Sequence, residues 1–498
     1  MIDALISGLS QTLQPDVLVY LVFGGLVGLV LGVIPGLGGV VGMSLALPFL
    51  FDMPTLPAVA LLVAIYATAT TGGSVTATLL NVPGTGANAA TLLDGYPMTQ
   101  KGEGTRAVAA GLVSSGIGGV IGVFFLLVAI PLAHPLIMAF SSSEVTMLVL
   151  LGITYVGVLG GGSPKRGIIS GLLGMLISLI GFDPVTGMDR FIFGIRPLAE
   201  GLHIVPVVTG LFAGAQMMKK LAKGEQRQTK GTEVQYEVSA KKFLQGTTDV
   251  LKRWWLVIRC SGLGTLIGAI PGLGGDVAAF MAYAHGQQTS KNPELYGKGY
   301  VEGVIAPESA NNAKEGGSLI PTLFFGVPGS AGMAILLSGF MILGLQPGKE
   351  MISTKLDLVF SIGWQLAIAN VIGVFMFLPF VKILLRFAYI RDTVMIPAIL
   401  LTVTTASWIV RGMLVDVFAC LIFTLIGYTI RKFNYSAPAV LLGFILGRIF
   451  ENNLFLSIQL HGPLFLLQKP LALVILVLTI LGVAQQVYKN RKHRTAGL

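Results

Sequence analysis

The sequence predicts an all-α polytopic membrane protein with two inverted-topology repeats, and three observations lead to this fold class. Of its 498 residues, 54% are hydrophobic and only 11% are charged, whereas soluble domains carry about 25% charged residues. The hexapeptide Ile-Pro-Gly-Leu-Gly-Gly occurs at residues 34–39 and again, unchanged, at residues 270–275. Basic loops alternate along the chain, and their order in the first half is opposite to that in the second.

Apolar runs long enough to cross a bilayer, about 20 residues each, recur along the whole chain. They occupy residues 17–33, 107–130, 145–159, 167–181, 204–218, 254–270, 359–380, 394–410, 413–430, 438–446 and 471–487. The runs do not alternate apolar and polar residues, as strands of a membrane barrel would, so we expect helices. Residues 34–105 and 271–345 fit either full crossings or half-membrane hairpins.

The distribution of Lys and Arg predicts how the chain crosses the membrane. Residues 219–253 and the tail from Lys489 are basic, and basic loops stay in the cytoplasm. The first sixteen residues carry Asp3 and Asp16 but no base. We therefore expect a periplasmic N-terminus and a cytoplasmic C-terminus, with the segment 451–463 outside.

The same topology predicts that the two halves are inverted copies. The run 107–130 ends outside, whereas its counterpart 359–380 ends inside. Inverted repeats with discontinuous helices or re-entrant hairpins are typical of secondary transporters, and we expect an elevator-like movement of one unit against the other. The expected parts are a first repeat over 1–218, a basic cytoplasmic linker over 219–253, a second repeat over 254–466, and a further helix with a basic tail over 467–498.

Composition and motifs exclude several other classes. The net charge of +10 is concentrated in the linker and the tail, so we expect a lipid bilayer and no nucleic acid as partner. Cys260 and Cys420 lie in apolar runs and predict neither a disulfide nor a metal site. No phosphate-binding G-x-x-x-x-G-K-[ST] loop and no catalytic constellation is present. We expect no enzyme activity, no catalytic residues and no cofactor, and an ion gradient as the energy source.

The duplicated hexapeptide predicts two broken helices. Proline removes a backbone donor, glycine lets the backbone turn, and irregular backbone within the membrane must face protein or water. Freed carbonyls suit a sodium ion and helix starts suit a carboxylate; a glycine-lined packing seam is the alternative. The residues expected to bind a cation, with sodium at the same loops, or to gate are Pro35, Gly36, Gly38, Gly39, Pro271, Gly272, Gly274, Gly275 and Asp276.

A second matched block lies downstream of each hexapeptide and is rich in hydroxyl and amide groups. Such groups bind a carboxylate without carrying a fixed charge, although hydroxyls also bond their own helix backbone. The residues expected to bind substrate are Gly72, Gly73, Ser74, Asn81, Pro83, Gly84, Thr85, Asn311, Asn312, Gly317, Ser318, Pro328, Gly329 and Ser330. Ionisable side chains near these blocks are functional if they lie at membrane depth, which the sequence leaves open: Asp94, Asp276, Glu302, Glu308, Lys314 and Glu315.

Taken together, these stretches resemble the large membrane subunit of the tripartite tricarboxylate transporter family. The stretches that carry the resemblance are Gly32-Val-Ile-Pro-Gly-Leu-Gly-Gly39, Gly72-Gly-Ser-Val-Thr-Ala-Thr-Leu-Leu-Asn-Val-Pro-Gly84, Leu93-Asp-Gly-Tyr-Pro97, Phe182-Asp-Pro-Val-Thr-Gly187, Arg190-Phe-Ile-Phe-Gly194, Glu302-Gly-Val-Ile-Ala-Pro-Glu-Ser-Ala-Asn-Asn312, Val327-Pro-Gly-Ser330 and Gly344-Leu-Gln-Pro-Gly348.

The resemblance implies a permease of the bacterial inner membrane. It implies two partners, a small four-helix membrane subunit and a periplasmic substrate-binding protein. It also implies uptake of citrate or a related carboxylate by symport with a cation, Na⁺ being expected and H⁺ the other candidate. A passive organic-anion channel remains the alternative, because the residues alone do not distinguish it from a symporter.

Overall fold

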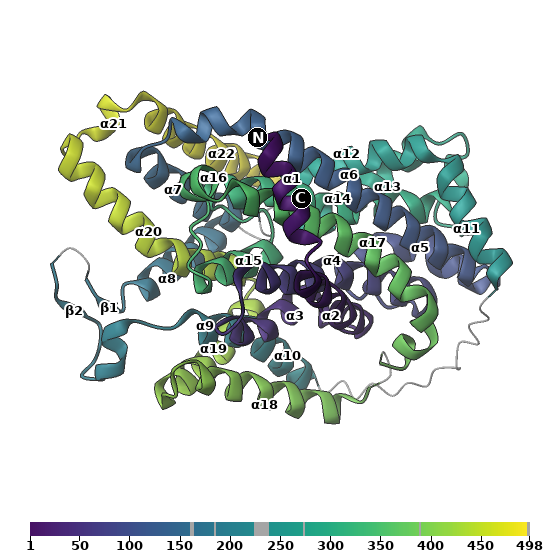
Figure 1. The fold of residues 1–498 in the computed structure, drawn as a ribbon, viewed down its shortest axis with the longest axis horizontal. Helices are drawn as coiled ribbons and strands as arrows, with labels where there is room; N and C mark the ends of the chain where they lie inside the picture. Colours follow the sequence, from purple (N-terminus) through teal and green to yellow (C-terminus); the bar gives the residue numbers. More distant parts are fainter. Residues whose placement is uncertain (160–163, 184–185, 224–238, 272–273, 388–389, 496–498) are drawn as a thin grey trace.

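The structure is a computed structural model that describes residues 1–498 except 160–163, 184–185, 224–238, 272–273, 388–389 and 496–498. The described part is almost entirely helical, as predicted (Figure 1). The exception is an antiparallel hairpin of β1 (Gly181–Phe182) and β2 (Asp189–Arg190), which projects from one edge of the molecule.

Helices α1 to α10 and three short helical segments make up the first half. They are α1 (Ile2–Thr12), α2 (Pro15–Val33), α3 (Gly38–Ala46), η1 (Leu47–Leu50), α4 (Thr55–Leu80), α5 (Asn88–Gln100), α6 (Gly104–Met138), α7 (Ser142–Leu159), α8 (Pro164–Ser178), η2 (Arg196–Glu200), α9 (Ile204–Thr209), η3 (Gly210–Gly214) and α10 (Ala215–Lys223).

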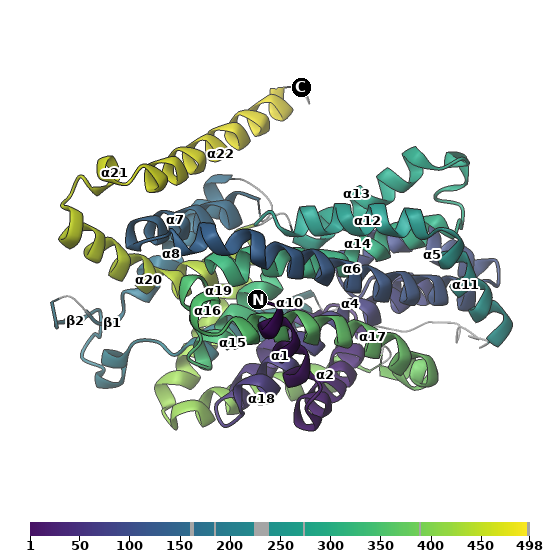
Figure 2. The ribbon, with the colours of Figure 1, turned by 45° about the horizontal axis from the view of Figure 1, so that its top comes forward.

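Helices α11 to α22 and one short helical segment make up the second half. It contains α11 (Ala240–Lys252), α12 (Trp254–Gly268), α13 (Gly274–Thr289), η4 (Pro293–Leu295), α14 (Glu302–Phe325), α15 (Ala331–Ile342), α16 (Lys349–Thr354), α17 (Leu356–Phe387), α18 (Asp392–Arg411), α19 (Leu414–Lys432), α20 (Ala437–His461), α21 (Phe465–Gln468) and α22 (Pro470–Thr495). Figure 2 shows α22 extending away from the rest of the molecule.

Within the described ranges, seven helices are long and apolar enough to cross a membrane: α2, α4, α6, α17, α18, α19 and α20. This number fits a chain that crosses the bilayer several times.

Two of these helices add to what the sequence predicted. Helix α4 is the one long helix within the region left open over 34–105, and its apolar stretch is entirely buried. The run expected to end at 446 continues as α20 to His461, so much of the segment 451–463 is helix.

Close backbone packing holds each half together. In the first half, α2 lies against α4 through Gly24, Gly28 and Gly32, one residue in every four. A Cβ atom on these glycines would lie 2.7, 2.4 and 2.2 Å from backbone oxygens of α4. Small residues at this spacing let two membrane helices approach closely. Helix α4 is therefore fixed between α2 and the elements on its other sides.

The second half uses the same type of packing between α12 and α14. A Cβ atom on Gly264 would lie 2.5 Å from the Ala310 oxygen, and one on Gly268 would lie 2.2 Å from the Lys314 oxygen. The long helices then cross between the halves, since α17 packs on α4 and α6 packs on α14. Helices α4 and α14 thus lie together at the centre of the molecule, each supported by its own half and by the other.

Candidate functional site

Helices α4 and α14 end with the same backbone geometry. The residue after each helix is left-handed, Asn81 with φ 56° and Gly326 with φ 65°. The next N–H group in each copy donates to the carbonyl six residues earlier, over 3.4 Å in the first copy and 3.1 Å in the second. A Pro-Gly turn follows, closed by Thr85 or Ser330, and leads into the short helix α5 or α15. The second matched block is therefore a helix break in both halves.

Each turn folds back onto the helix that precedes it. A Cβ atom on Gly84 would lie 2.4 Å from the Gly73 Cα and 2.3 Å from a backbone oxygen of α2. A Cβ atom on Gly329 would lie 2.8 Å from the Ser318 Cα and 2.8 Å from a backbone oxygen of α12. The structure therefore brings the predicted residues together within each half. At these glycines it shows tight backbone packing, a role that the sequence analysis considered only for the glycines of the hexapeptides.

The neighbouring glycines of the block have the same packing role. A Cβ atom on Gly72 would lie 2.7 Å from the Leu29 oxygen, and one on Gly317 would lie 2.1 Å from the Thr265 oxygen. The hydroxyls of Thr68, Thr70, Thr71 and Thr76 donate to carbonyls of their own helix. This is the alternative considered for the block, and it applies to much of α4.

The first hexapeptide forms a break between α2 and α3, as predicted. Gly36 and Gly38 have positive φ angles of 82° and 62°. A Cβ atom on Gly38 would lie 3.3 Å from the Thr85 methyl group, and one on Gly36 would lie 3.2 Å from the Gln216 amide of α10. The break at Pro35 therefore lies beside the turn that follows α4, so two predicted blocks meet in the first half.

The second hexapeptide is described only in part. Helix α13 begins at Gly274, after a turn at Pro271. Gly272 lies outside the described residues, as does the side chain of Asp276. Gly274 and Gly275 are described only as part of helix α13. Whether this break copies the geometry of the first one stays a prediction.

Tyr66 links the starts of two helices, α3 and α15, and a third helix begins nearby. Its hydroxyl lies 3.1 Å from the Ser330 hydroxyl, which caps α15. Cβ atoms on Gly39 and Gly332 would lie 2.8 and 2.1 Å from its ring. Helix α5 begins at Asn88, whose amide donates to a carbonyl of α4 one turn further on. Helices α3, α5 and α15 thus begin around one short stretch of α4, and helix N-termini carry partial positive charge.

Helices α4 and α14 run antiparallel where they meet. Thr70 donates to Asn312 over 3.0 Å, whereas Ser74, four residues later on α4, hydrogen-bonds with Glu308, four residues earlier on α14. Since Gly72 and Gly317 occupy matched positions in the sequence, matched helices of the two halves cross in opposite directions.

Two adjacent amides on α14 have different surroundings. Asn312 is fully bonded, because it accepts from Thr70 and donates to Thr71 over 3.1 Å and to Asn370 of α17 over 2.6 Å. Asn311 is fully buried, and neither of its amide atoms has a hydrogen-bond partner in the described part of the chain. A buried polar group without a partner costs roughly 1–3 kcal/mol. Asn311 is therefore suited to bind a ligand.

Two charged groups lie along the same stretch of α14. The Lys314 ammonium is 3.2 Å from the Glu315 carboxylate, and the side chains are 6% and 1% exposed. Burying an ion pair is costly unless its geometry is excellent, and charges at membrane depth are usually functional. The pair lies one turn from Asn311, so a ligand at the crossing would meet an amide, an ammonium and a carboxylate.

Glu308 is a fully buried carboxylate surrounded by neutral donors. It accepts from Ser115 of α6 over 2.7 Å, from Asn88 of α5, and from Thr91 and Ser74. Among the described residues, no Lys or Arg forms an ion pair with it. Sequence reasoning named Glu308 but left its depth open, and the structure places it at the centre.

Two other ionisable candidates have structural roles. Asp94 accepts four hydrogen bonds, from Tyr283 over 2.8 Å and from the backbone N–H groups of Gly297, Gly299 and Tyr300 over 2.8–3.0 Å. It therefore ties α5 to the loop before α14. Glu302 likewise pairs with Arg253 over 2.9 Å at the start of α12. Neither carboxylate has free acceptor capacity toward the crossing.

Comparison with protein families now decides the class of the protein. The model of the tripartite tricarboxylate transporter TctA family matches residues 18–442, which include both broken helices and the crossing. The chain belongs to this family. It is a multi-pass membrane protein of a transporter family, which indicates a transporter and not an enzyme, and members of this family work in a tripartite system.

Two relatives come from Agrobacterium vitis. An uncharacterized 52.8 kDa protein in the TAR-I ttuC' 3' region is 31% identical over 457 residues, 91% of this chain and 89% of the relative. An uncharacterized protein in the TAR-II ttuC' 3' region is 32% identical over 191 residues, 38% of this chain and 79% of the relative. No solved structure matches the chain.

Sequence reasoning missed three residues of the crossing. Tyr66, Ser115 and Asn370 bond to or lie against predicted residues, but none lies in a duplicated motif. A signal was present for Asn370, since it is the amide in the middle of an apolar run. No comparable signal marked Tyr66, whose partner Ser330 lies 264 positions away.

Proposed function

We propose that this TctA-family protein is the permease subunit that imports a tricarboxylate or related carboxylate, such as citrate, by secondary active transport. One observation carries the proposal. Three helix starts, those of α3, α5 and α15, gather around the point where α4 and α14 cross, and the unpartnered amide of Asn311 lies at that crossing.

The chemistry of the crossing fits an organic anion. Helix N-termini attract carboxylates through their free N–H groups and partial positive charge. Ser330 stands at the start of α15 and supplies a hydroxyl, and Asn311 supplies an amide. Thr85 stands at the start of α5, where its hydroxyl donates to Asn88 over 2.6 Å. Lys314 offers the one buried ammonium of the described crossing, and Glu315 partly neutralises it. Mostly neutral donors would let the site release its ligand again.

Inverted repeats and alternating access form the next part of the proposal. The matched helix ends, the matched glycine packing and the antiparallel crossing of α4 and α14 support an inverted pair. A cavity of about 280 Å³ lies where the segment after η1 and the end of α15 meet the segment before α9 and helix α20. Phe51 and Met341 line one side of it, and His203 and Phe444 line the other. We infer that the crossing elements slide along this boundary in an elevator-like movement.

Glu308 is the proposed group for the coupling cation. A buried carboxylate that accepts only from neutral donors is stable when a cation or proton neutralises it. Its hydroxyl neighbours also provide the oxygen atoms that a hard cation prefers. Na⁺ is the proposed ion, and H⁺ is the other candidate. This assignment differs from the sequence-based expectation, which placed the cation at the hexapeptide breaks.

The proposed partners are a small four-helix membrane subunit and a periplasmic binding protein that delivers the carboxylate. The proposed location is the bacterial inner membrane, with the N-terminus in the periplasm and the C-terminus in the cytoplasm. The tripartite nature of the family supports these partners in general terms.

The test is labelled-citrate uptake into proteoliposomes that contain both membrane subunits, with the binding protein added outside. Saturable uptake above the outside concentration, driven by an inward sodium or proton gradient, would support the proposal. Separate sodium and proton gradients identify the ion. Flux that only follows the citrate gradient would contradict the proposal and favour a channel.

A further inference from the structure

A second polar region lies at the start of α12, away from the crossing. A cavity of about 280 Å³ opens there, lined by Arg253, Arg259, Thr289, Lys291, Asn292 and Glu302 among others. It is formed by the start of α12, the end of α13 and the start of α14. Three of its side chains are cationic and one is a carboxylate. The proposed transport function assigns no role to this cavity.

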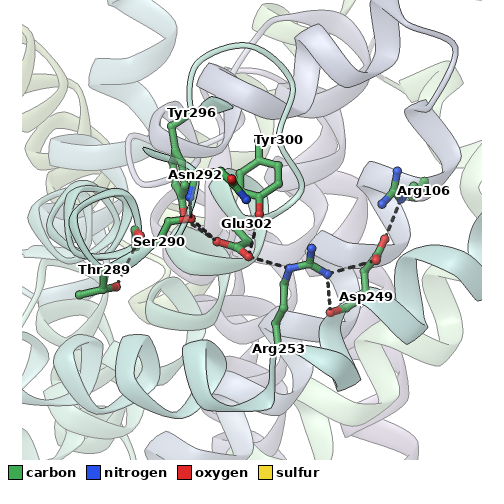
Figure 3. A network of polar contacts seen from close by, with 10 residues as sticks. Arg106, Asp249, Arg253, Thr289, Ser290, Asn292, Tyr296, Tyr300 and Glu302 are labelled. Atoms are coloured by element: carbon green, nitrogen blue, oxygen red, sulfur yellow. Dashed lines mark hydrogen bonds and ion pairs between the residues drawn. The ribbon is translucent and has the colours of Figure 1, made fainter. Parts of the chain in front are cut away.

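The carboxylate of the cavity is already neutralised. Figure 3 shows Glu302 at one end of a chain of ion pairs. It accepts from Arg253 over 2.9 Å and from the hydroxyls of Tyr300 and Ser290 over 2.9 Å. Arg253 also pairs with Asp249 over 3.2 Å, and Asp249 pairs with Arg106 over 2.6 Å. Arg106 also pairs with Glu103 over 2.9 Å. Both arginines of this network therefore have carboxylate partners, and neither is left for a ligand.

Arg259 and Lys291 are outside this network of ion pairs. Neither forms an ion pair with a described carboxylate, and the Arg259 Nε atom is buried without a hydrogen-bond partner in the described part of the chain. Thr289 and Asn292 add a hydroxyl and an amide to the same lining. The cavity therefore has two uncompensated positive charges and further hydrogen-bond donors. An anion with several oxygen acceptors, such as a phosphate group, matches this set.

The surface next to the cavity is apolar. Trp254 and Trp255 at the start of α12 are 60% and 55% exposed, and Leu266 further along the helix is 69% exposed. A Cβ atom on Gly262, between them, would have no atom within 4 Å. Trp255, Arg259, Gly262 and Leu266 follow a helical spacing of four, three and four residues, so they share one face. An open apolar track of about 10 Å thus runs from the cationic cavity along α12.

We propose that this cavity binds the phosphate headgroup of an anionic membrane phospholipid, whose acyl chain lies along the α12 track. Three features favour a lipid over a soluble phosphate: the apolar track continues from the cavity, exposed tryptophans mark a membrane interface, and basic cavities between membrane helices hold anionic headgroups. The predicted topology places this end of α12 at the cytoplasmic leaflet. The bound lipid would join α12 to the start of α14, which Arg253 and Glu302 already connect.

The test measures which lipids the purified full-length protein retains and how they stabilise it. Native mass spectrometry would count bound lipids in the wild type, in Lys291→Gln and in Arg259→Gln/Lys291→Gln. Lys355→Gln/Lys432→Gln is the control, because it also removes two positive charges, both of them exposed and outside the cavity lining. Thermal unfolding in phosphatidylglycerol and phosphatidylcholine nanodiscs, and in detergent with inorganic phosphate, is the second readout.

The proposal predicts that phosphatidylglycerol raises the unfolding midpoint of the wild type and the control by several degrees relative to phosphatidylcholine. The double variant should lose this shift and retain on the order of tenfold less anionic lipid. Lys291→Gln, which changes an exposed side chain, should lie between them. Equal lipid retention in wild type and double variant would overturn the proposal. So would an equal shift with inorganic phosphate alone, which would identify a soluble anion.

Discussion

Helices α4 and α14 have the same backbone design but different chemistry. Both are buried, both pack on a partner helix through glycines, and both end in a left-handed residue and a Pro-Gly turn. The polar side chains of α4 are neutral hydroxyls, and several bond to their own backbone. Helix α14 carries Glu308, Asn311, Lys314 and Glu315, all buried.

The turns after the two helices also differ. Asn81 is exposed, whereas Gly326 to Gly329 are buried. The comparison shows that a duplicated backbone can provide the geometry of a site twice while its charge is provided once. The first half would then mainly supply helix starts for anion binding, and the second half the groups that bind the cation and orient the substrate.

The largest effect is expected for Glu308→Gln, which keeps the size of the side chain and removes its charge. If Glu308 carries the coupling cation, gradient-driven citrate accumulation in proteoliposomes should fall at least tenfold. Exchange of citrate across the membrane should persist, because the substrate groups are intact. Ser74→Ala is the matched change on α4 and should reduce accumulation much less. Full accumulation by Glu308→Gln would refute the assignment.

The adjacent amides give the next test, because one is bonded and the other is not. Asn311→Ala should weaken citrate binding roughly tenfold or more with little loss of stability, since no protein hydrogen bond is lost. Asn312→Ala should instead lower stability by roughly 1–3 kcal/mol, since Thr70, Thr71 and Asn370 lose a partner. Binding calorimetry and thermal unfolding distinguish these results. If the two effects were exchanged between the variants, the ligand role of Asn311 would be wrong.

The matched turns can be compared through Gly84→Ala and Gly329→Ala. Both should destabilise the protein, because the new Cβ atom meets backbone atoms at 2.3 and 2.4 Å in the first turn and at 2.8 Å in the second. Overpacking of this kind costs roughly 1–3 kcal/mol, and Gly84→Ala should cost more. Thermal unfolding in detergent would measure both.

Gly262→Ala is the control for these two variants, because it adds a Cβ atom in open space on α12. It should be neutral or slightly stabilising. An equally neutral Gly84→Ala would show that the first turn is not packed as described.

The smallest effect is expected at the helix caps of α9 and α20, because only one of the two capping side chains titrates. His203 accepts from the Val205 N–H group through Nδ1, and burial lowers its pKa from 6.5 to about 4. Ser436 caps α20 in the same way but does not titrate. Because the folded state disfavours the protonated imidazole, stability is full above pH 6.5 and falls as the pH approaches 4.

The expected loss between pH 7 and pH 5 is roughly 1 kcal/mol for the wild type. His203→Ser should unfold with a weaker dependence on pH in the same range. An unchanged pH dependence would show that His203 does not make this contribution.

Much of the fold was predictable from the sequence, because it depends on local features. The length of the apolar runs predicted most of the long helices. The proline and glycine of each matched block predicted the breaks after α4 and α14. The continuation of α20 beyond residue 446 was not predictable from hydropathy, because the buried Glu451 interrupts the apolar run and is neutralised by Arg190, 261 positions away.

The candidate site was predictable only in part, because its contacts join distant segments. The sequence does not distinguish Asn311 from Asn312. Only the positions of α4 and α17 show that Asn312 is hydrogen-bonded. The glycines of the blocks were expected at the ligand, yet the nearest contacts at Gly72, Gly84, Gly317 and Gly329 are with backbone. Because glycine has no side chain, it suits close packing against backbone and close approach to a ligand equally well.

The most direct test of the account is a paired uptake measurement on wild type and Asn311→Ala in the complete tripartite assembly. Under an inward cation gradient, the wild type should accumulate labelled citrate above its outside concentration with saturable kinetics. Asn311→Ala should need a much higher citrate concentration for the same rate. The account would be contradicted if the wild type only equilibrated citrate, or if both proteins accumulated citrate with the same concentration dependence.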